Sequence, residues 1–168
     1  MTDLRVVVPG KPVPKARPRF DSRSGRTYTA TKTVQYERHV KGEAWAATRR
    51  AEWPKPDDCA RVTARLKLRA PGSKLPRCTC AFCATEYRVA LLVVLPDRRT
   101  RDLDNVTKSI LDACNGVLWY DDRQVVGVSM ERAINRARPR VEILVSVATG
   151  QSELVLGDVD GMCTGGPS

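Results

Sequence analysis

The spacing of apolar residues along the chain predicts five strands. Residues 4–8 are rich in β-branched side chains and end at a Pro-Gly pair, as short strands do. Residues 62–68 alternate between apolar and polar positions, which is typical of a strand with one solvated face. Residues 87–95 are mostly apolar, and this pattern favours a central position in a sheet. The last two predicted strands are residues 124–132 and 140–147.

The first of two helices is predicted between Thr31 and Pro54. Its apolar residues recur every three or four positions from Tyr36 to Ala51. Either Thr31 or Thr33 can cap its N-terminus, because a threonine hydroxyl can accept a hydrogen bond from an N–H group of the first turn. The proline then ends the pattern.

The second helix is predicted after Asp104, whose carboxylate can cap it. Its apolar stripe runs from Val106 to Val117, and the Asn115-Gly116 pair supplies a stop signal. With the strands, the predicted order is β-α-β-β-α-β-β. This order indicates an α+β fold, with a mixed sheet and two main helices.

A single domain of residues 1–148 accommodates these elements, since a chain of 168 residues is close to the usual size of one domain. The Gly-rich residues 149–168 are expected to be a disordered tail. No apolar run approaches the roughly 20 residues that span a bilayer, and the N-terminus lacks the basic-then-apolar pattern of a signal peptide. The sequence therefore predicts a cytoplasmic protein with no membrane partner.

The formal net charge of the chain is +10, and residues 151–168 contain acidic but no basic side chains. The predicted domain is therefore even more basic than the whole chain. Such an excess favours a polyanionic partner, and nucleic acid fits better than a membrane surface because no amphipathic basic helix is visible. A merely solvated basic surface is the alternative.

Prolines and cations are concentrated in residues 9–32, which predicts an extended basic arm. The cations of such an arm can hold phosphates without reading the base sequence, although a solvated loop would have the same composition. Phe20 and Tyr28 can either stack on bases or pack in the core. The candidate phosphate contacts are Lys11, Lys15, Arg17 and Arg19 in the arm, and Arg98, Arg99 and Arg101 farther along the chain.

Five aspartates fall within residues 102–122 of this basic chain. Asp102 and Asp104 are two residues apart, so in extended geometry their carboxylates point the same way and can share one cation. Asp104, Lys108 and Asp112 follow helical spacing, which places Lys108 over the same site. In the alternative interpretation, Asp104 only caps the helix and Asp112 only pairs with Lys108. The remaining two aspartates are Asp121 and Asp122.

Oxygen ligands in this number suit Mg²⁺ or Mn²⁺ better than zinc. A hard divalent ion polarises a phosphoryl group and lowers the pKa of an attacking water. A lysine beside the ion can stabilise the charge that develops on the phosphate. The acidic cluster therefore indicates metal-dependent phosphodiester hydrolysis, with capping and ordinary surface charge as the alternative.

Two short motifs enclose the acidic residues. Residues 102–108 form a D-x-D-N-x-x-K pattern, and residues 119–125 form a W-x-D-D-x-Q-V pattern. With the basic segment at residues 9–20, these motifs resemble the RusA family of Holliday-junction resolvases from bacteria and their prophages. The resemblance covers most of residues 4–147, and the two acidic motifs are its diagnostic part.

The resemblance implies a homodimeric endodeoxyribonuclease that resolves four-way junctions of DNA in recombination and repair, with Mg²⁺ or Mn²⁺. Carried over by motif, the metal ligands are Asp102, Asp104 and Asp122, and Lys108 completes the catalytic set. The segment before the D-D pair is one residue shorter here than in the family pattern, so Asp121 is the alternate to Asp122.

Two rival functions differ in their demands on the carboxylates. A non-catalytic module that binds branched DNA gains nothing from negative charge placed against phosphate, so the intact aspartates argue against it. A flap or fork nuclease would use the same carboxylates, and the sequence does not separate it from a junction resolvase.

Three of the six cysteines, Cys78, Cys80 and Cys83, lie in an insertion at residues 70–86 that departs from the family pattern. With no export signal, a framework of disulfides is disfavoured. The Cys80-x-x-Cys83 spacing is that of a zinc knuckle, and Cys59 with Cys78 can complete four thiolates. Reduced thiols are the favoured interpretation, because C-x-C-x-x-C lacks a second clean pair.

Three further residues are predicted to have no part in catalysis. Trp119 is expected to pack beside the acidic site, and Cys114 lies on an apolar stripe and is expected in the core. His39, the single histidine, is expected at the surface because its neighbours are charged.

Overall fold

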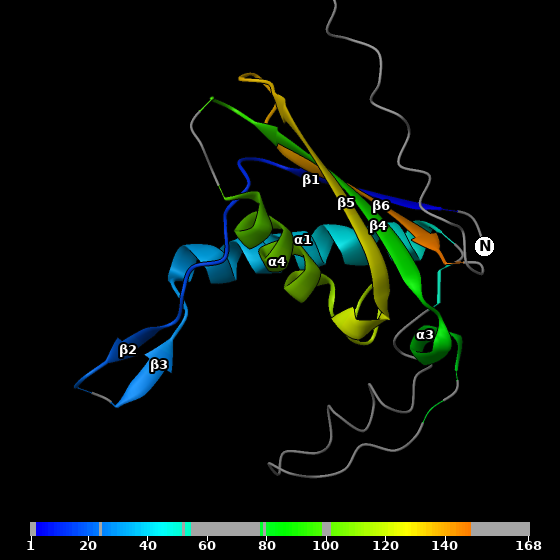
Figure 1. Cartoon of the computed structure of the whole chain (residues 1–168), viewed down its shortest axis with the longest axis horizontal. Coiled ribbons are helices and arrows are strands. Elements are labelled where there is room, and N and C mark those ends of the chain that lie inside the picture. The colour runs from blue at the N-terminus through cyan, green and yellow to red at the C-terminus, as the bar shows by residue number, and fades with distance from the viewer. Residues whose placement is uncertain are drawn as a thin grey trace, which may run out of the picture.

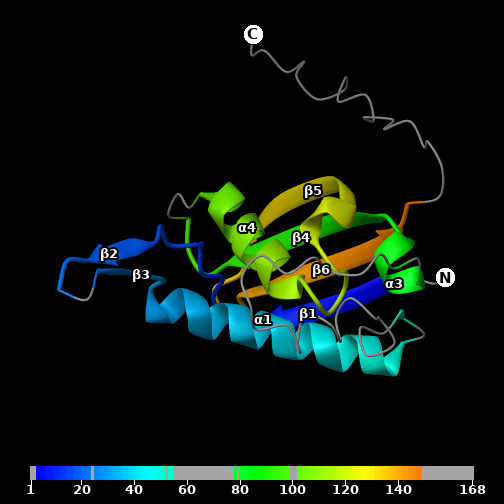
Figure 2. The same cartoon turned by 90° about the horizontal axis from the view of Figure 1, so that it is seen from below.

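The computed structural model describes residues 3–23, 25–51, 53–54, 78, 80–98 and 102–148. In these ranges, two long helices lie on one face of a four-stranded sheet, and a small hairpin projects from the body (Figure 1, Figure 2). The helices are α1 (Thr31–Arg50), α3 (Ala81–Ala84), α4 (Leu103–Cys114) and the 3-10 helix η2 (Asp122–Gln124). The sheet consists of β1 (Leu4–Pro9), β4 (Tyr87–Leu95), β5 (Val125–Ile134) and β6 (Arg140–Val147), and the hairpin of β2 (Arg19–Asp21) and β3 (Arg26–Tyr28).

The sheet is mixed, with the strand order β1-β6-β4-β5. Strand β6 pairs antiparallel with both β1 and β4, whereas β4 and β5 run parallel. Parallel neighbours need a crossover connection, which here contains α4 and η2. The predicted α+β class with a mixed sheet is confirmed, and β4 lies inside the sheet as its apolar sequence indicates.

The core lies between the sheet and the two long helices. Successive side chains of β4 point to opposite faces, so Val89 and Leu91 are buried while Ala90 is exposed. Helix α1 contributes the buried Val40, and α4 contributes Ile110. Each such aliphatic side chain stabilises the fold by about 1.5–3 kcal/mol. This packing fixes the position of α4, which carries Asp104 and Asp112 and has Asp102 as its N-cap.

Helix α1 begins where the sequence predicts, but it is capped differently. Its N-cap is Ala30, which makes no side-chain capping hydrogen bond, so the predicted capping by Thr31 or Thr33 is wrong. The backbone N–H of Thr33 donates instead to the carbonyl of Ala30, at 2.9 Å. The Thr33 hydroxyl accepts a hydrogen bond from the backbone N–H of Ala16, at 3.3 Å, and so joins the helix to the basic arm.

The basic arm is only partly extended. Residues 11–18 form neither helix nor strand, as expected, but β2 and β3 then form a hairpin that the sequence did not predict. Its register pairs Arg19 with Tyr28 and Phe20 with Thr27. In Figure 1 the hairpin points away from the sheet and helices.

Some of the predicted elements are confirmed, and others lie outside the described residues. The predicted strands at residues 124–132 and 140–147 correspond to β5 and β6 and are confirmed. The predicted strand at residues 62–68 and the tail at residues 149–168 lie outside the described residues. Within the insertion, the structure shows the short helix α3, which was not predicted. In the described ranges, no helix is long and apolar enough to cross a membrane.

Candidate active site

The N-terminus of α4 carries Asp102 and Asp104. Asp102 is the N-cap, and its carboxylate accepts hydrogen bonds from the backbone N–H of Asn105, at 3.2 Å, and from the Asn105 side-chain amide. The predicted capping by Asp104 is wrong, because the helix begins at Leu103 and Asp104 lies in its first turn. The expected extended geometry is wrong for the same reason, since helical residues two apart do not face each other. Both carboxylates are nevertheless exposed at the same end of α4.

Farther along α4, Lys108 is exposed and Asp112 is partly buried. Helical spacing places Asp104, Lys108 and Asp112 along one face of the helix. Asp112 forms an ion pair with a residue of the arm: the Lys15 ammonium lies 2.8 Å from the Asp112 carboxylate. The alternative in which Asp112 is only a partner of Lys108 therefore misses its long-range contact.

Lys15 connects the arm to both long helices. Its ammonium lies 2.6 Å from the Glu37 carboxylate of α1 as well as next to Asp112, and its backbone N–H donates to the carbonyl of Asn105 at 2.8 Å. Burial lowers the pKa of the Lys15 ammonium, but the hydrogen bonds to Asp112 and Glu37 outweigh this effect and raise it. Lys15 is therefore a charged residue beside the acidic helix, and its contact with phosphate stays a prediction.

The D-D pair of the second motif is held by Gln124. The Gln124 Oε1 accepts hydrogen bonds from the backbone N–H groups of Tyr120, at 2.8 Å, and Asp121, at 3.2 Å. Its Nε2 donates to the carbonyls of Phe82, at 2.9 Å, and Thr85, at 2.7 Å. One side chain thus joins the D-D segment to the residues around α3. Sequence reasoning missed this role, and the place of Gln124 in the motif was its only signal.

Asp122 lies close to two other carboxylates. Desolvation raises the pKa of Asp122, the hydrogen bond and charge of Asp121 raise it further, and the charge of Asp112 adds to the effect. Asp121 also caps η2, because its carboxylate accepts a hydrogen bond from the backbone N–H of Arg123 at 3.2 Å. The fold therefore brings Asp112, in the last turn of α4, close enough to the D-D pair for its charge to act on Asp122, and crowded carboxylates favour a bound cation.

The carboxylates of Asp102, Asp104 and Asp122 do not all lie within 4.8 Å of one another in this structure. Among the described residues, the ligand atoms that come within 4.8 Å of one another in a group of three are those of Cys78, Cys80 and Cys83. The assignment of Asp102, Asp104 and Asp122 to one metal ion therefore stays a prediction.

Exposed cations lie on the arm and just after β4. Lys11 and Arg98 line one surface pocket together with Arg136, which precedes β6 and which the sequence analysis did not single out. Of the predicted phosphate contacts, Lys11, Arg17, Arg19 and Arg98 are exposed, whereas Arg99 and Arg101 lie outside the described residues.

The hairpin exposes two aromatic side chains. Phe20 is 69% exposed and Tyr28 is 50% exposed. A core role for either residue is therefore wrong. Stacking on bases remains as a prediction, since an exposed aromatic ring on a basic hairpin is a typical stacking platform for nucleic acid.

The predicted positions of Trp119, Cys114 and His39 are confirmed. Trp119 is fully buried, its Nε1 donates to the Asn115 side chain at 2.8 Å, and its ring centroid lies 6.2 Å from that of Tyr87. Cys114 is fully buried, and burial raises the pKa of its thiol to about 12. His39 is exposed at the surface, with its Nε2 3.1 Å from the carbonyl oxygen of Pro9.

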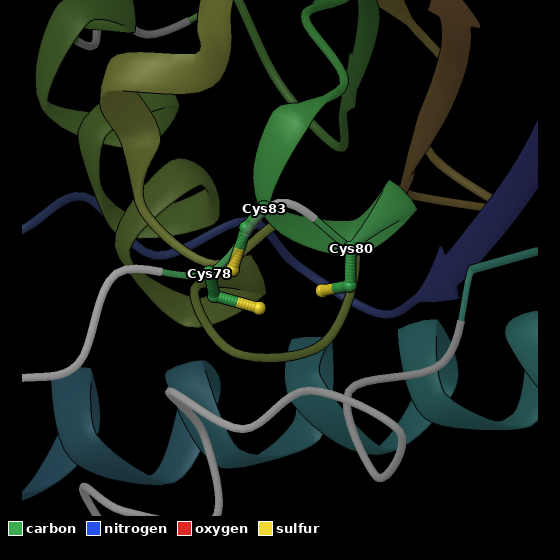
Figure 3. A group of neighbouring side chains, drawn as sticks. All are labelled: Cys78, Cys80 and Cys83. Atoms are coloured by element: carbon green, nitrogen blue, oxygen red, sulfur yellow. The ribbon is translucent and has the colours of Figure 1, made fainter.

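The insertion brings three thiols together. Figure 3 shows the side chains of Cys78, Cys80 and Cys83 converging at the start of α3. Cys59, the fourth candidate ligand, lies outside the described residues.

An acidic helix flanked by a basic arm, on a mixed α+β domain, is the arrangement expected of a metal-dependent enzyme that acts on nucleic acid. The model of one protein family, endodeoxyribonuclease RusA, matches residues 9–146. Because the match covers most of the chain, this protein belongs to the RusA family of Holliday-junction-resolving endodeoxyribonucleases. Among curated proteins, no relative matches the chain.

Proposed function

We propose that this chain is a Mg²⁺- or Mn²⁺-dependent endodeoxyribonuclease that selects four-way junctions by their structure. In this proposal Asp102, Asp104 and Asp122 hold the ion, Asp121 is the alternate to Asp122, and Lys108 acts beside them. The family match supports hydrolysis of branched DNA, and nucleases of this kind generally depend on a metal. A cytoplasmic location stays a prediction from the sequence.

The observation that carries the proposal is the family match over residues 9–146, which includes both acidic motifs. In the fold, Asp112 of α4 comes near the second motif, since its charge contributes to the raised pKa of Asp122. Negative charges that are brought together in this way are stabilised by a divalent cation. Lys15 already offsets the charge of Asp112 at 2.8 Å. In this proposal the ligands for the metal are therefore Asp122 and the exposed aspartates at the start of α4, and not Asp112.

The donor set is all carboxylate, which fits a hard ion such as Mg²⁺ or Mn²⁺. When bound, such an ion supplies Lewis-acid polarisation of the phosphoryl group and a water of lowered pKa. Lys108 is exposed on the helix face that also carries Asp104 and Asp112. Its ammonium would stabilise the negative charge that develops on the scissile phosphate.

The basic arm and hairpin would hold the DNA. Arg17 and Arg19 are exposed beyond the anchoring Lys15, and they would contact phosphates without reading sequence. Phe20 and Tyr28 would stack on bases where the strands of a junction separate, since they are exposed on the same hairpin.

A homodimer is part of the proposal, because a four-way junction has two-fold symmetry and paired nicks require two sites. Strand β5 lies at an edge of the sheet in the described part of the chain, and Val128, Met130 and Ile134 on it are exposed. They stand in register with the buried Val89, Leu91 and Leu95 of β4. The Thr107 hydroxyl of α4 donates to Met130 Sδ at 3.3 Å, so α4 covers part of this apolar face. A second copy of the chain would cover the part that is exposed at the edge.

The experiment that tests the proposed function compares labelled four-way junction, flap, fork and linear duplex, each with Mg²⁺, with Mn²⁺ and with a chelator. We expect cleavage of the junction alone, and only with a metal. Asp104→Asn should bind the junction normally and cleave it about 100-fold more slowly or worse. Preferred cleavage of flaps or forks would favour the alternative nuclease, and binding without cleavage under all conditions would favour a non-catalytic module.

A further inference from the structure

The sulfur atoms of Cys78, Cys80 and Cys83 lie within 4.8 Å of one another (Figure 3). Cys80 is the N-cap of α3, and the backbone N–H of Cys83 donates to the Cys80 carbonyl at 2.9 Å. This turn places two sulfurs on one side, and Cys78 approaches them from the preceding segment. All three are partly buried, and none of the described cysteines forms a disulfide.

These distances fit a tetrahedral thiolate site. Zn–S bonds of roughly 2.3 Å imply sulfur atoms roughly 3.8 Å apart, which is within the observed limit. Thiolates are soft ligands that select zinc over Mg²⁺, so this site and the carboxylates would take different ions. Three thiolates and one Zn²⁺ carry a net negative charge, which a chain of net charge +10 accommodates.

We infer that Cys78, Cys80 and Cys83 bind one Zn²⁺ that staples Cys78 to the turn at the start of α3. The helix α3 has four residues, which is too short for a helix to be stable by itself. Phe82 is buried and provides one apolar anchor for this turn. The ion provides a second, covalent-like constraint, and its fourth ligand is not specified by these three residues.

The staple reaches the D-D pair through Gln124. The carbonyl of Phe82, inside the cysteine turn, and that of Thr85, just after it, accept the two hydrogen bonds of Gln124 Nε2. The other end of the same amide holds the backbone of Asp121. The zinc therefore fixes the surface against which the D-D segment is positioned. The positioning of the D-D segment by the zinc site rests on the proposed function of that segment, whereas zinc binding itself does not.

Zinc binding is tested on the wild-type chain, purified in reductant without chelator, by elemental analysis. We expect about one zinc per chain, and after removal of the metal we expect titration with Co²⁺ to give the charge-transfer absorption of thiolate ligands. Metal-free protein that takes up no Co²⁺ through thiolates would overturn the inference. A disulfide between any two of the three cysteines in freshly purified protein would overturn it as well.

Variants separate this site from other thiols and from the carboxylates. Cys80→Ser and Cys83→Ser should each lose most of the zinc, whereas Cys114→Ala, at a described cysteine outside this group, and Asp104→Asn should keep it. Zinc retained in full by both Cys80→Ser and Cys83→Ser would contradict the assignment. If these two variants fail to fold, the Co²⁺ spectrum of the wild-type chain decides the question.

The link to the D-D pair is tested with Gln124→Glu. This variant keeps the acceptor for Tyr120 and Asp121 but lacks the donor to Phe82 and Thr85. We expect it to keep its zinc and to cleave about 10-fold more slowly, with a higher Mg²⁺ requirement, as for other outer partners of metal ligands. An unchanged rate and Mg²⁺ requirement would show that the staple does not position the D-D pair, and would leave both metal sites standing.

Discussion

The Lys15 ammonium lies 2.8 Å from the Asp112 carboxylate, so a cation of the N-terminal arm neutralises an aspartate of the acidic helix. The same ammonium contacts Glu37 of α1 at 2.6 Å. Lys15 is therefore an anchor of the arm, and its role differs from that of the exposed arginines that follow it. Lys15 should therefore contribute to the stability of the domain, and the exposed arginines to the binding of DNA.

Replacement of Lys15 by Gln should destabilise the domain, because Asp112 and Glu37 lose their common partner. The ion pairs are partly buried, so we expect a loss of roughly 1 kcal/mol in the free energy of unfolding, between the values for exposed and buried pairs. Urea denaturation of wild type and variant measures this loss. Arg17→Gln is the control and should unfold like wild type, and equal stability of the Lys15 variant would refute the anchoring role.

Exposed arm cations should contribute to binding and not to the chemical step. The double change Arg17→Gln and Arg19→Gln should weaken binding to all DNA shapes and reduce the slope of log K against log salt by about two units. At saturating protein the cleavage rate should change little. Lys108→Ala should do the reverse, with a nearly normal salt slope and a lower rate. If the arm variant binds normally while Lys108→Ala loses affinity, the two roles are exchanged.

Asp121 and Asp122 should differ in their contribution to catalysis. Asp121 caps η2, so Asp121→Asn keeps a capping acceptor and should retain most activity. Asp122→Asn should reduce the cleavage rate by about 100-fold or more, if Asp122 is a metal ligand. Single-turnover cleavage of a labelled junction measures both variants. An inactive Asp121→Asn with an active Asp122→Asn would move the ligand assignment by one residue.

The apolar residues of β5 should carry the dimer contact. Val128→Asp introduces a charge among exposed apolar side chains and should convert the proposed dimer into a monomer, as measured by sedimentation. The monomer should nick one strand of a junction without a paired second nick. Leu144→Asp is the matched control, because Leu144 is equally exposed on β6, in a strand away from this edge. Wild-type protein that is monomeric yet makes paired nicks would rule out the dimer.

Glu142 should make the stability of the sheet depend on pH. Hydrogen bonds from Arg5 and Arg140 lower the pKa of Glu142 from its ordinary value of 4.5. Because the pKa is lower in the folded state, the ionised Glu142 stabilises the fold at pH values above its ordinary pKa. This contribution is lost as the pH falls through the folded-state pKa. Glu142→Gln should therefore lower the melting temperature at pH 7, by an amount equivalent to no more than about 1 kcal/mol. The gap between variant and wild type should close in acid, and a gap of constant size would disprove this linkage.

The sequence by itself determined the fold class, the two long helices and the strands that became β1, β4, β5 and β6. These elements follow from local periodicity, since buried positions recur every two residues in a strand and every three or four in a helix. The acidic motifs could also be recognised, because each lies within a short stretch of chain. The buried positions of Trp119 and Cys114 followed from the same apolar patterns.

Only the tertiary structure decided which distant residues meet. The capping of α4 by Asp102 depends on where the helix begins, and a choice between Asp102 and Asp104 has no strong local signal. The contacts of Lys15 with Asp112 and of Gln124 with Thr85 join residues that are far apart in sequence. The first contact arises because α4 packs on the sheet beside α1. The second arises because β4 and β5 are parallel, so the residues just before β5, including Gln124, lie near those just before β4, including Thr85. Periodicity carries no record of such packing, so these partners could be found only in three dimensions.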